Sequence, residues 1–333
     1  MVRFVTSCLV GLVFLGGVSL SEAAQKKNRR TAYLSAKEAG PDFVIQGEYV
    51  GKLVSEEGKK NVGVQVIALG DGKFRAVLYS GGLPGAGWDR SEEKLEVDGR
   101  VEGKKAVFKA EEGTGVIQDG VLTVTTSDGV ELGTLKKITR KSKTLGEKAP
   151  EGAVVLFDGS SATNFQKGRM TKDGLLMEGT TSKQKFQSFK LHFEFQLSFM
   201  PYARGQGRSN SGVYMQGRYE CQILDSFGLA GKQNECGGIY SIKDPAVNMC
   251  FPPLSWQTYD IEFTAAKFDS DGKKIKNAYM TVWHNGVKIH DNVELPKTTT
   301  AAPVRVGPEP GPIYIQNHGN PIRFRNIWLV ERK

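Results

Sequence analysis

The chain has 333 residues, enough for one large domain or two ordinary ones with their own cores. Its formal net charge of +9 would suit nucleic acid, but the excess lies in two short basic runs, at 26–30 and 136–143, and the rest of the chain is balanced. Such runs are typical of solvated tails and linkers, so we expect no nucleic-acid partner. Nothing in the sequence identifies a protein partner.

Residues 1–23 have the pattern of a secretory signal peptide. Arg3 precedes an apolar run from Leu9 to Leu20, and Ser21-Glu22-Ala23 forms a small-x-small cleavage site. The run is too short to span a bilayer, and no later segment is apolar for 18 residues. We therefore expect an exported protein, periplasmic or extracellular, with no membrane span.

Turn dipeptides of the Asp-Gly or Asn-Gly type recur along the chain and separate short runs rich in Val, Ile, Phe, Tyr and Thr, such as 62–69, 73–80 and 121–126. This pattern is typical of antiparallel hairpins, and no convincing amphipathic helix of 12 residues interrupts it. The sequence therefore predicts an all-β protein.

A basic segment without apolar periodicity, ending in Pro-Glu-Gly, predicts a linker at 139–152. Before it we expect a basic N-terminal segment at 24–41 and a small β-domain of six or seven strands at 42–138, of unknown function. After it we expect a larger β-domain at 153–333.

The stretch NSGVYMQGRYECQILDSFG, residues 210–228, has an unusual polar face. With period two, one side carries Tyr214, Gln216, Arg218, Glu220 and Gln222. Other strands alternate too: 189–199 places Glu194 on its polar side, and 313–319 groups Gln316 with His318. Polar residues on the solvent side of a sheet are ordinary. If these faces lie on one sheet, however, they form a groove of the kind that binds sugar rings.

Three cysteines follow the predicted signal peptide. Cys221 falls on the apolar side of its strand and is expected to be buried filler. Cys236 and Cys250 flank a loop of 13 residues and are a candidate disulfide in an exported protein.

Six segments resemble the 3-keto-disaccharide hydrolase (DUF1080) domain family: 156–159, 210–228, 236–240, 252–263, 284–295 and 311–329. The resemblance covers 153–333 and implies a concanavalin A-like jelly-roll sandwich. It also implies cleavage of glycosides oxidised at C3 of the sugar, with an oligosaccharide or glycoside as the partner. Phe165 stands where the family usually has a Trp-containing segment, and the loop 198–210 is longer than usual.

A C3 ketone acidifies the hydrogen at C2, so a base can remove it and expel the C1 substituent by β-elimination, with water then adding for net hydrolysis. The candidate bases are Glu220, Glu194 and His318, and Arg218 is the candidate partner of the enolate oxygen. The candidate sugar-binding residues are Asn210, Tyr214, Gln216, Gln222, Asp225, Gln316 and Arg325.

Two other functions stay open. Glu220, Gln222 and Asp225 are similar to the carboxylate-rich strand of laminarinase-type glycosidases, which would imply a conventional two-carboxylate hydrolase. The same sandwich also carries lectins, so a non-catalytic carbohydrate-binding module is the third possibility. No cofactor is certain; a divalent metal on the groove is possible, but no short ligand motif demands one, and its ligands stay unknown.

Overall fold

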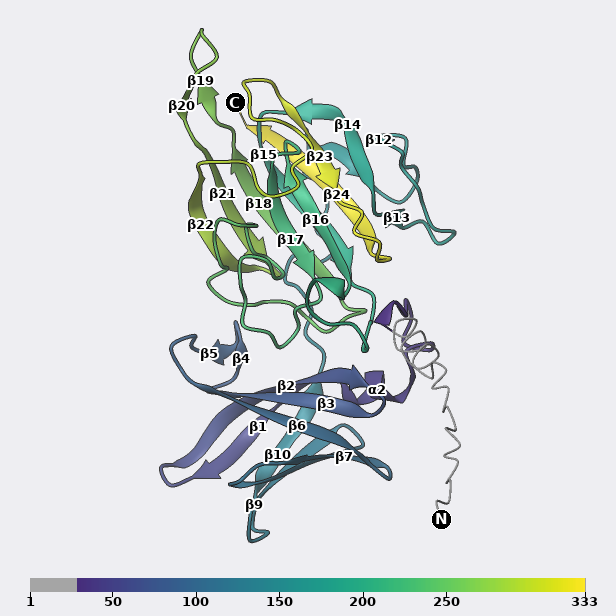
Figure 1. Ribbon diagram of the computed structural model, residues 1–333, viewed down its shortest axis with the longest axis vertical. Helices are drawn as coiled ribbons and strands as arrows, with labels where there is room; N and C mark the ends of the chain where they lie inside the picture. Colours follow the sequence, from purple (N-terminus) through teal and green to yellow (C-terminus); the bar gives the residue numbers. More distant parts are fainter. Residues whose placement is uncertain (1–28, 333) are drawn as a thin grey trace, which may run out of the picture.

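The computed structural model describes residues 29–332, in which a closed β-barrel lies below a two-sheet sandwich (Figure 1). The prediction of an all-β chain, with a jelly-roll sandwich preceded by a smaller β-domain, is confirmed. The predicted signal peptide, residues 1–23, lies outside the described residues. Within 29–332, no helix has both the length and the apolar character needed to cross a bilayer.

The barrel is an antiparallel meander whose last strand pairs with its first. Its strands are β1 (Gly47–Ser55), β2 (Gly58–Gly70), β3 (Lys73–Ser80), β6 (Lys94–Glu102), β7 (Lys105–Lys109), β8 (Gly113–Gln118), β9 (Val121–Thr126) and β10 (Glu131–Ile138). The sequence predicted six or seven strands for this domain, whereas the barrel alone has eight and closes through the pairing of β10 with β1. A short helix, α2 (Gly40–Ile45), precedes the barrel, and the small strands β4 (Leu83–Pro84) and β5 (Gly87–Trp88) pair outside it.

The sandwich consists of a seven-stranded and a five-stranded sheet. The seven-stranded sheet contains β11 (Val154–Phe157), β13 (Leu176–Met177), β15 (Ser188–Gln196), β18 (Trp256–Thr264), β21 (Ala278–His284), β22 (Val287–Leu295) and β24 (Arg323–Arg332). The five-stranded sheet contains β12 (Phe165–Gln166), β14 (Thr180–Phe186), β16 (Asn210–Met215), β17 (Tyr219–Leu224) and β23 (Gly311–Ile315). Outside both lie the pair β19 (Lys267–Phe268) and β20 (Lys274–Lys276) and the 3-10 turn η1 (Gly205–Gly207).

Alternating side chains build the core between the two sheets. Phe189, Leu191, Phe193 and Phe195 of β15 are all buried against it, as period two predicts. The polar side chains between them project from the outer face of the seven-stranded sheet. Each sheet therefore has one apolar inner face and one polar outer face.

The barrel and the sandwich share a core. Ile67, Val77 and Tyr79, on the outside of the barrel, belong to the same buried cluster as the sandwich core. Residues 139–150, called the strap below, then cross the outer face of the seven-stranded sheet. Ser142 Oγ lies 2.6 Å from Thr258 Oγ1, and the backbone N–H of Gly146 donates to Glu194 Oε1 at 2.6 Å. The segment that the sequence predicted to be a linker is thus packed against the sandwich.

Candidate functional site

The stretch 210–228 forms a hairpin, so the prediction of one continuous strand face is wrong. Gln216 and Gly217 adopt left-handed conformations (φ 55° and 63°), and the N–H of Arg218 donates to the carbonyl of Met215 at 3.0 Å. This closes a tight turn between β16 and β17. Gln216 and Arg218 therefore leave the sheet face that their spacing suggested.

Arg218 and Gln216 hold the hairpin turn in place. The Arg218 guanidinium donates to the carbonyls of Arg305 (2.8 Å) and Glu309 (3.0 Å) and to Gln216 Oε1 (2.8 Å). Gln216 Nε2 donates to the carbonyl of Phe186 at 2.9 Å. Both side chains are buried and their donors point at protein oxygens. The structure thus gives them a structural role, which corrects their prediction as catalytic and sugar-binding residues.

The outer face of the five-stranded sheet carries the remaining polar row. Because Tyr214 pairs with Glu220 across the hairpin and with Tyr314 on β23, these side chains lie together. We call the outward set the Glu220 face: Tyr214, Glu220, Gln222, Tyr314 and Gln316. Gly212 makes room at its centre, since a Cβ there would stand 2.1 Å from Glu220 Oε1.

Glu220 is the central ionisable group of this face. It is 2% exposed, and burial raises the pKa of its carboxyl to about 8, although a hydrogen bond with Tyr214 works in the opposite direction. The Tyr214 ring is fully buried, and its hydroxyl lies 3.3 Å from the carbonyl of Thr300. Tyr214 therefore positions Glu220 and cannot serve as a surface on which a sugar stacks.

Amide side chains surround the lower end of the face. Asn210 Nδ2 donates to the carbonyl of Gln206 at 2.9 Å, and Gln222 Nε2 donates to Gln206 Oε1 at 3.3 Å. Asn210 Oδ1 is buried and has no partner in the part of the chain that the structure describes. A buried acceptor of this kind is suited to a hydroxyl donor from a ligand. Gln206 was missed by sequence reasoning; its only signal was the unusual length of the loop 198–210.

A cleft of about 650 Å³ is lined in part by residues that follow the polar residues of this face closely in the chain. His318 and Gly207 line it, and they follow Gln316 and Gln206 closely in the chain. The His318 side chain is exposed, and Arg204 stands on the same wall. The structure therefore places His318 on the wall of this cleft, and its role as a base stays a prediction.

Asp225 lies off the Glu220 face. Its carboxylate is fully buried, 2.8 Å from the guanidinium of Arg208, and it accepts the N–H of Phe227 at 3.4 Å. The prediction that Asp225 binds sugar is wrong, because this ion pair already occupies the carboxylate.

Glu194 and Arg325 lie on the outer face of the other sheet. Arg325 Nε donates to Glu194 Oε2 at 2.7 Å, and its guanidinium stacks 4.0 Å above the ring of Trp256. The strap covers Glu194 from the opposite side through Gly146. The expected single groove is therefore wrong, because β15 and β18 belong to one sheet while β16, β17 and β23 belong to the other. Glu194 and Arg325 do not join Glu220.

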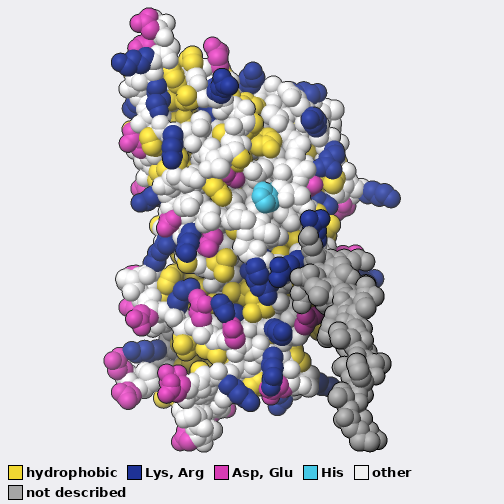
Figure 2. Space-filling model, viewed as in Figure 1, with side chains coloured by type: hydrophobic (Ala, Val, Ile, Leu, Met, Phe, Trp, Pro, Cys, Tyr) yellow, Lys and Arg dark blue, Asp and Glu magenta, His cyan; other side chains and the backbone are white. Residues whose placement is uncertain are grey.

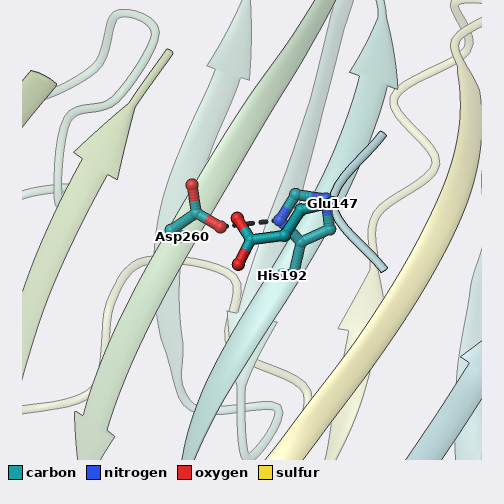
Figure 3. A group of neighbouring side chains, drawn as sticks. All are labelled: Glu147, His192 and Asp260. Carbon is teal, nitrogen blue, oxygen red and sulfur yellow. Dashed lines mark hydrogen bonds and ion pairs between the residues drawn. The ribbon is translucent and has the colours of Figure 1, made fainter. Parts of the chain in front are cut away.

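Three potential metal ligands meet beneath the strap. In Figure 3, Glu147 of the strap points toward His192 and Asp260 on neighbouring strands, and their ligand atoms lie within 4.8 Å of one another. One imidazole and two carboxylates would suit zinc or manganese. However, His192 also faces Glu194 at 3.4 Å and Asp260 at 2.6 Å. Burial disfavours its charge, but these two partners outweigh burial and raise the pKa of His192 to about 9. His192, Asp260 and Glu194 thus form an ion-pair network on the sheet, and the strap joins it through Thr144 Oγ1, which donates to Asp260 Oδ2 at 2.6 Å, and through the N–H of Gly146.

This network predicts a pH-dependent stability. Because the pKa of His192 is raised from 6.5 to about 9, the folded state holds its proton more tightly than the unfolded chain does. The stabilisation is fully present below pH 6.5 and is lost as the pH rises through about 9. We expect the free energy of unfolding of wild type to fall by up to ~1.4 kcal/mol per pH unit across this window through His192.

Denaturant unfolding at several pH values checks this expectation. The loss should be smaller in His192→Gln, whereas His318→Gln, which alters an exposed imidazole, should keep the wild-type slope. Equal slopes in all three proteins would contradict the assignment.

The three cysteines Cys221, Cys236 and Cys250 are free and buried. Cys236 and Cys250 lie side by side, with a hydrogen bond between their thiols, so the disulfide between them stays a prediction. Cys236 Sγ lies 3.2 Å from the Tyr259 hydroxyl, and Cys250 Sγ faces the carbonyl of Leu224 at 3.6 Å. Each thiol fills the sandwich core next to an oxygen partner.

The sandwich half of the chain matches a known protein family, and parts of the chain are similar to two solved structures. Residues 152–330 match the family described as the 3-keto-alpha-glucoside-1,2-lyase-like domain. Two crystal structures from Parabacteroides distasonis, both provisionally named glycosyl hydrolases, share 33% and 17% identity with this chain. The match to the first covers 55% of this chain and 85% of the other chain, with a TM-score of 0.48. The match to the second covers 55% of this chain and 95% of the other chain, with a TM-score of 0.40. No curated protein matches. More than half of the chain thus lies within the matched family, and the protein belongs to the 3-keto-alpha-glucoside-1,2-lyase-like domain family of carbohydrate-active proteins.

Proposed function

We propose that the sandwich cleaves 3-keto-glycosides on the Glu220 face, with Glu220 as the group that removes the proton from C2. The observation that carries this proposal is the buried carboxyl of Glu220, with a pKa of about 8, in the middle of a sheet face lined with amides. Family membership supports the same substrate class.

The raised pKa suits both halves of the reaction. A carboxylate whose conjugate acid has a pKa of about 8 is a stronger base than an ordinary one. After it accepts a proton, the same group holds that proton at neutral pH and can pass it to an oxygen. At pH 7 about one-tenth of the molecules carry the ionised form that the first step requires.

The bond changes follow from the position of the ketone. Glu220 takes the C2 proton, and the electron pair of the C2–H bond forms an enolate with the C3 oxygen. The enolate collapses to a C1–C2 double bond as the C1–O bond breaks, and the leaving oxygen gains a proton. Addition of water across the new double bond, OH at C1 and H at C2, gives the free 3-keto-sugar. In this proposal Asn210, Gln222 and Gln316 bind sugar hydroxyls or the C3 oxygen, and His318, which lines the cleft, gives a proton to the leaving oxygen.

The geometry gives less support to the rival functions. A two-carboxylate hydrolase needs a second carboxylate facing Glu220, whereas Asp225 is paired with Arg208 and Glu194 lies on the other sheet. A lectin-like module requires no ionisable group at the centre of the face, and burying one there costs stability.

The direct test is turnover of a 3-keto-glucoside by the full chain, with the rate without protein subtracted at each pH. We expect kcat/KM to rise with pH up to about 8 and then level off, because the ionised form of Glu220 is the base. Saturable binding without product would favour the lectin-like alternative. Turnover with a flat profile would show that another group is the base.

A further inference from the structure

The barrel contains an apolar cavity that the proposed function does not use. It has a volume of about 230 Å³ and is lined by inward-facing side chains of neighbouring strands. They include Val64, Ala76, Leu78, Phe108, Leu122 and Val124. An eight-stranded barrel is just wide enough either to be filled by its own side chains or to hold one small ligand.

One end of the barrel is closed. Phe43 and Ile45 of α2 pack into the barrel core together with Phe199 from the sandwich. The rings of Phe43 and Phe199 meet edge to face at 5.3 Å. Segments that precede and follow the barrel in the chain therefore close this end.

The opposite end is open and apolar. Leu95 at the rim is 47% exposed, and the cavity residues Leu53, Leu78 and Val97 are only half-buried although they point inward. Small residues line the cavity at this end: Ala110 in the turn between β7 and β8, and Gly113 and Gly115 at the start of β8. Figure 2 shows hydrophobic side chains reaching the surface in the barrel half of the molecule.

This asymmetry points to a ligand. Protein interiors are normally packed without voids, and leaving inward-facing apolar surface in contact with water forfeits about 25 cal/mol per Å². A filled barrel would need only larger residues at a few positions such as Ala76. The cavity is also smaller than a site for a drug-sized molecule, for which about 300 Å³ or more is typical.

We propose that the barrel binds one alkyl chain of a small neutral amphiphile, with its tail in the cavity and its head at the open rim. The lining contains no cation, and its one carboxylate, Glu112, stands at the exposed rim. An anionic head would therefore meet a like charge and no counter-charge from the lining, whereas a hydroxyl or a sugar would remain hydrated. The site is separate from the Glu220 face and does not depend on the activity proposed there.

Fluorescence of N-phenyl-1-naphthylamine with the full chain tests this proposal. We expect saturable binding of one probe per chain, displaced by 1-decanol and at least about tenfold less well by decanoate. Ala76→Phe fills the cavity and Val97→Trp narrows its mouth, and each should weaken probe binding by at least about tenfold. The matched control is Thr123→Phe, because Thr123 lies between Leu122 and Val124 on β9 and is not a lining residue.

Thermal melting of each variant shows whether the barrel has kept its fold; if Ala76→Phe does not fold, Val97→Trp decides. Absence of saturable binding in wild type overturns the proposal. Binding that is unchanged in the folded cavity variants overturns it as well, since the probe would then lie elsewhere. Tighter binding of decanoate than of 1-decanol would overturn the proposal that the head group of the ligand is neutral.

Discussion

Replacing Glu220 with glutamine is expected to lower kcat toward a 3-keto-glycoside by at least about 100-fold, the usual scale for loss of a general base. Glutamine has the same shape and can keep the contact with Tyr214, but it cannot accept the C2 proton. Steady-state kinetics on the purified variant measure the effect. KM should change much less than kcat, because the amides that bind the sugar are untouched.

The same substitution should leave the protein folded and more stable at alkaline pH. Burial raises the pKa of Glu220 from 4.5 to about 8, so the free energy of unfolding of wild type falls across this range as the pH rises. Glutamine does not ionise, so the variant should melt at a higher temperature than wild type above about pH 8.

The matched control for Glu220→Gln is Glu262→Gln. Glu262 pairs with Lys190 at 2.7 Å on the partly exposed face of the other sheet. This control should keep wild-type turnover and stability, because exposed pairs contribute at most ~1 kcal/mol. A Glu220→Gln variant with near-normal turnover would refute the proposed role of Glu220.

Replacing Asp225 with asparagine is expected to destabilise the protein by about 3–5 kcal/mol. The Arg208–Asp225 pair is buried, with side-chain exposures of 5% and 0%, so the variant leaves the Arg208 charge without its counter-ion away from water. Chemical denaturation measures the loss. Activity per folded molecule should fall far less than in Glu220→Gln, because Asp225 lies off the Glu220 face.

A double variant distinguishes the loss of the ion pair itself from the cost of leaving one buried charge unpaired. Arg208→Met with Asp225→Leu should recover much of the stability, since apolar residues of similar volume often replace a buried pair at little cost. Asp98→Asn is the exposed control: it removes the partner of Arg75 at 2.7 Å and should cost less than ~1 kcal/mol. If Asp225→Asn costs no more than Asp98→Asn, the buried pair is not a determinant of stability.

Several features of this protein follow from its sequence alone. The turn dipeptides and the alternation in 189–199 predict antiparallel strands and the buried row from Phe189 to Phe195, because the side-chain period of a strand is independent of its neighbours. The same local rule placed Tyr214, Glu220 and Gln222 on one face. That grouping survived the hairpin because the cross-strand register pairs Tyr214 with Glu220.

The tertiary structure decided which polar residues meet. Period two cannot tell whether two strands share a sheet, so Glu194 and Glu220 looked equivalent although they lie on outer faces of different sheets. Whether a polar side chain faces a ligand or other groups of the protein depends on segments distant in sequence. The carbonyls of Arg305 and Glu309 accept hydrogen bonds from Arg218, and the guanidinium of Arg208 pairs with the Asp225 carboxylate. Burial alone raises the pKa of Glu220, and burial is a property of the folded chain. The strap over His192 and the open end of the barrel likewise depend on long-range packing, which no local pattern encodes.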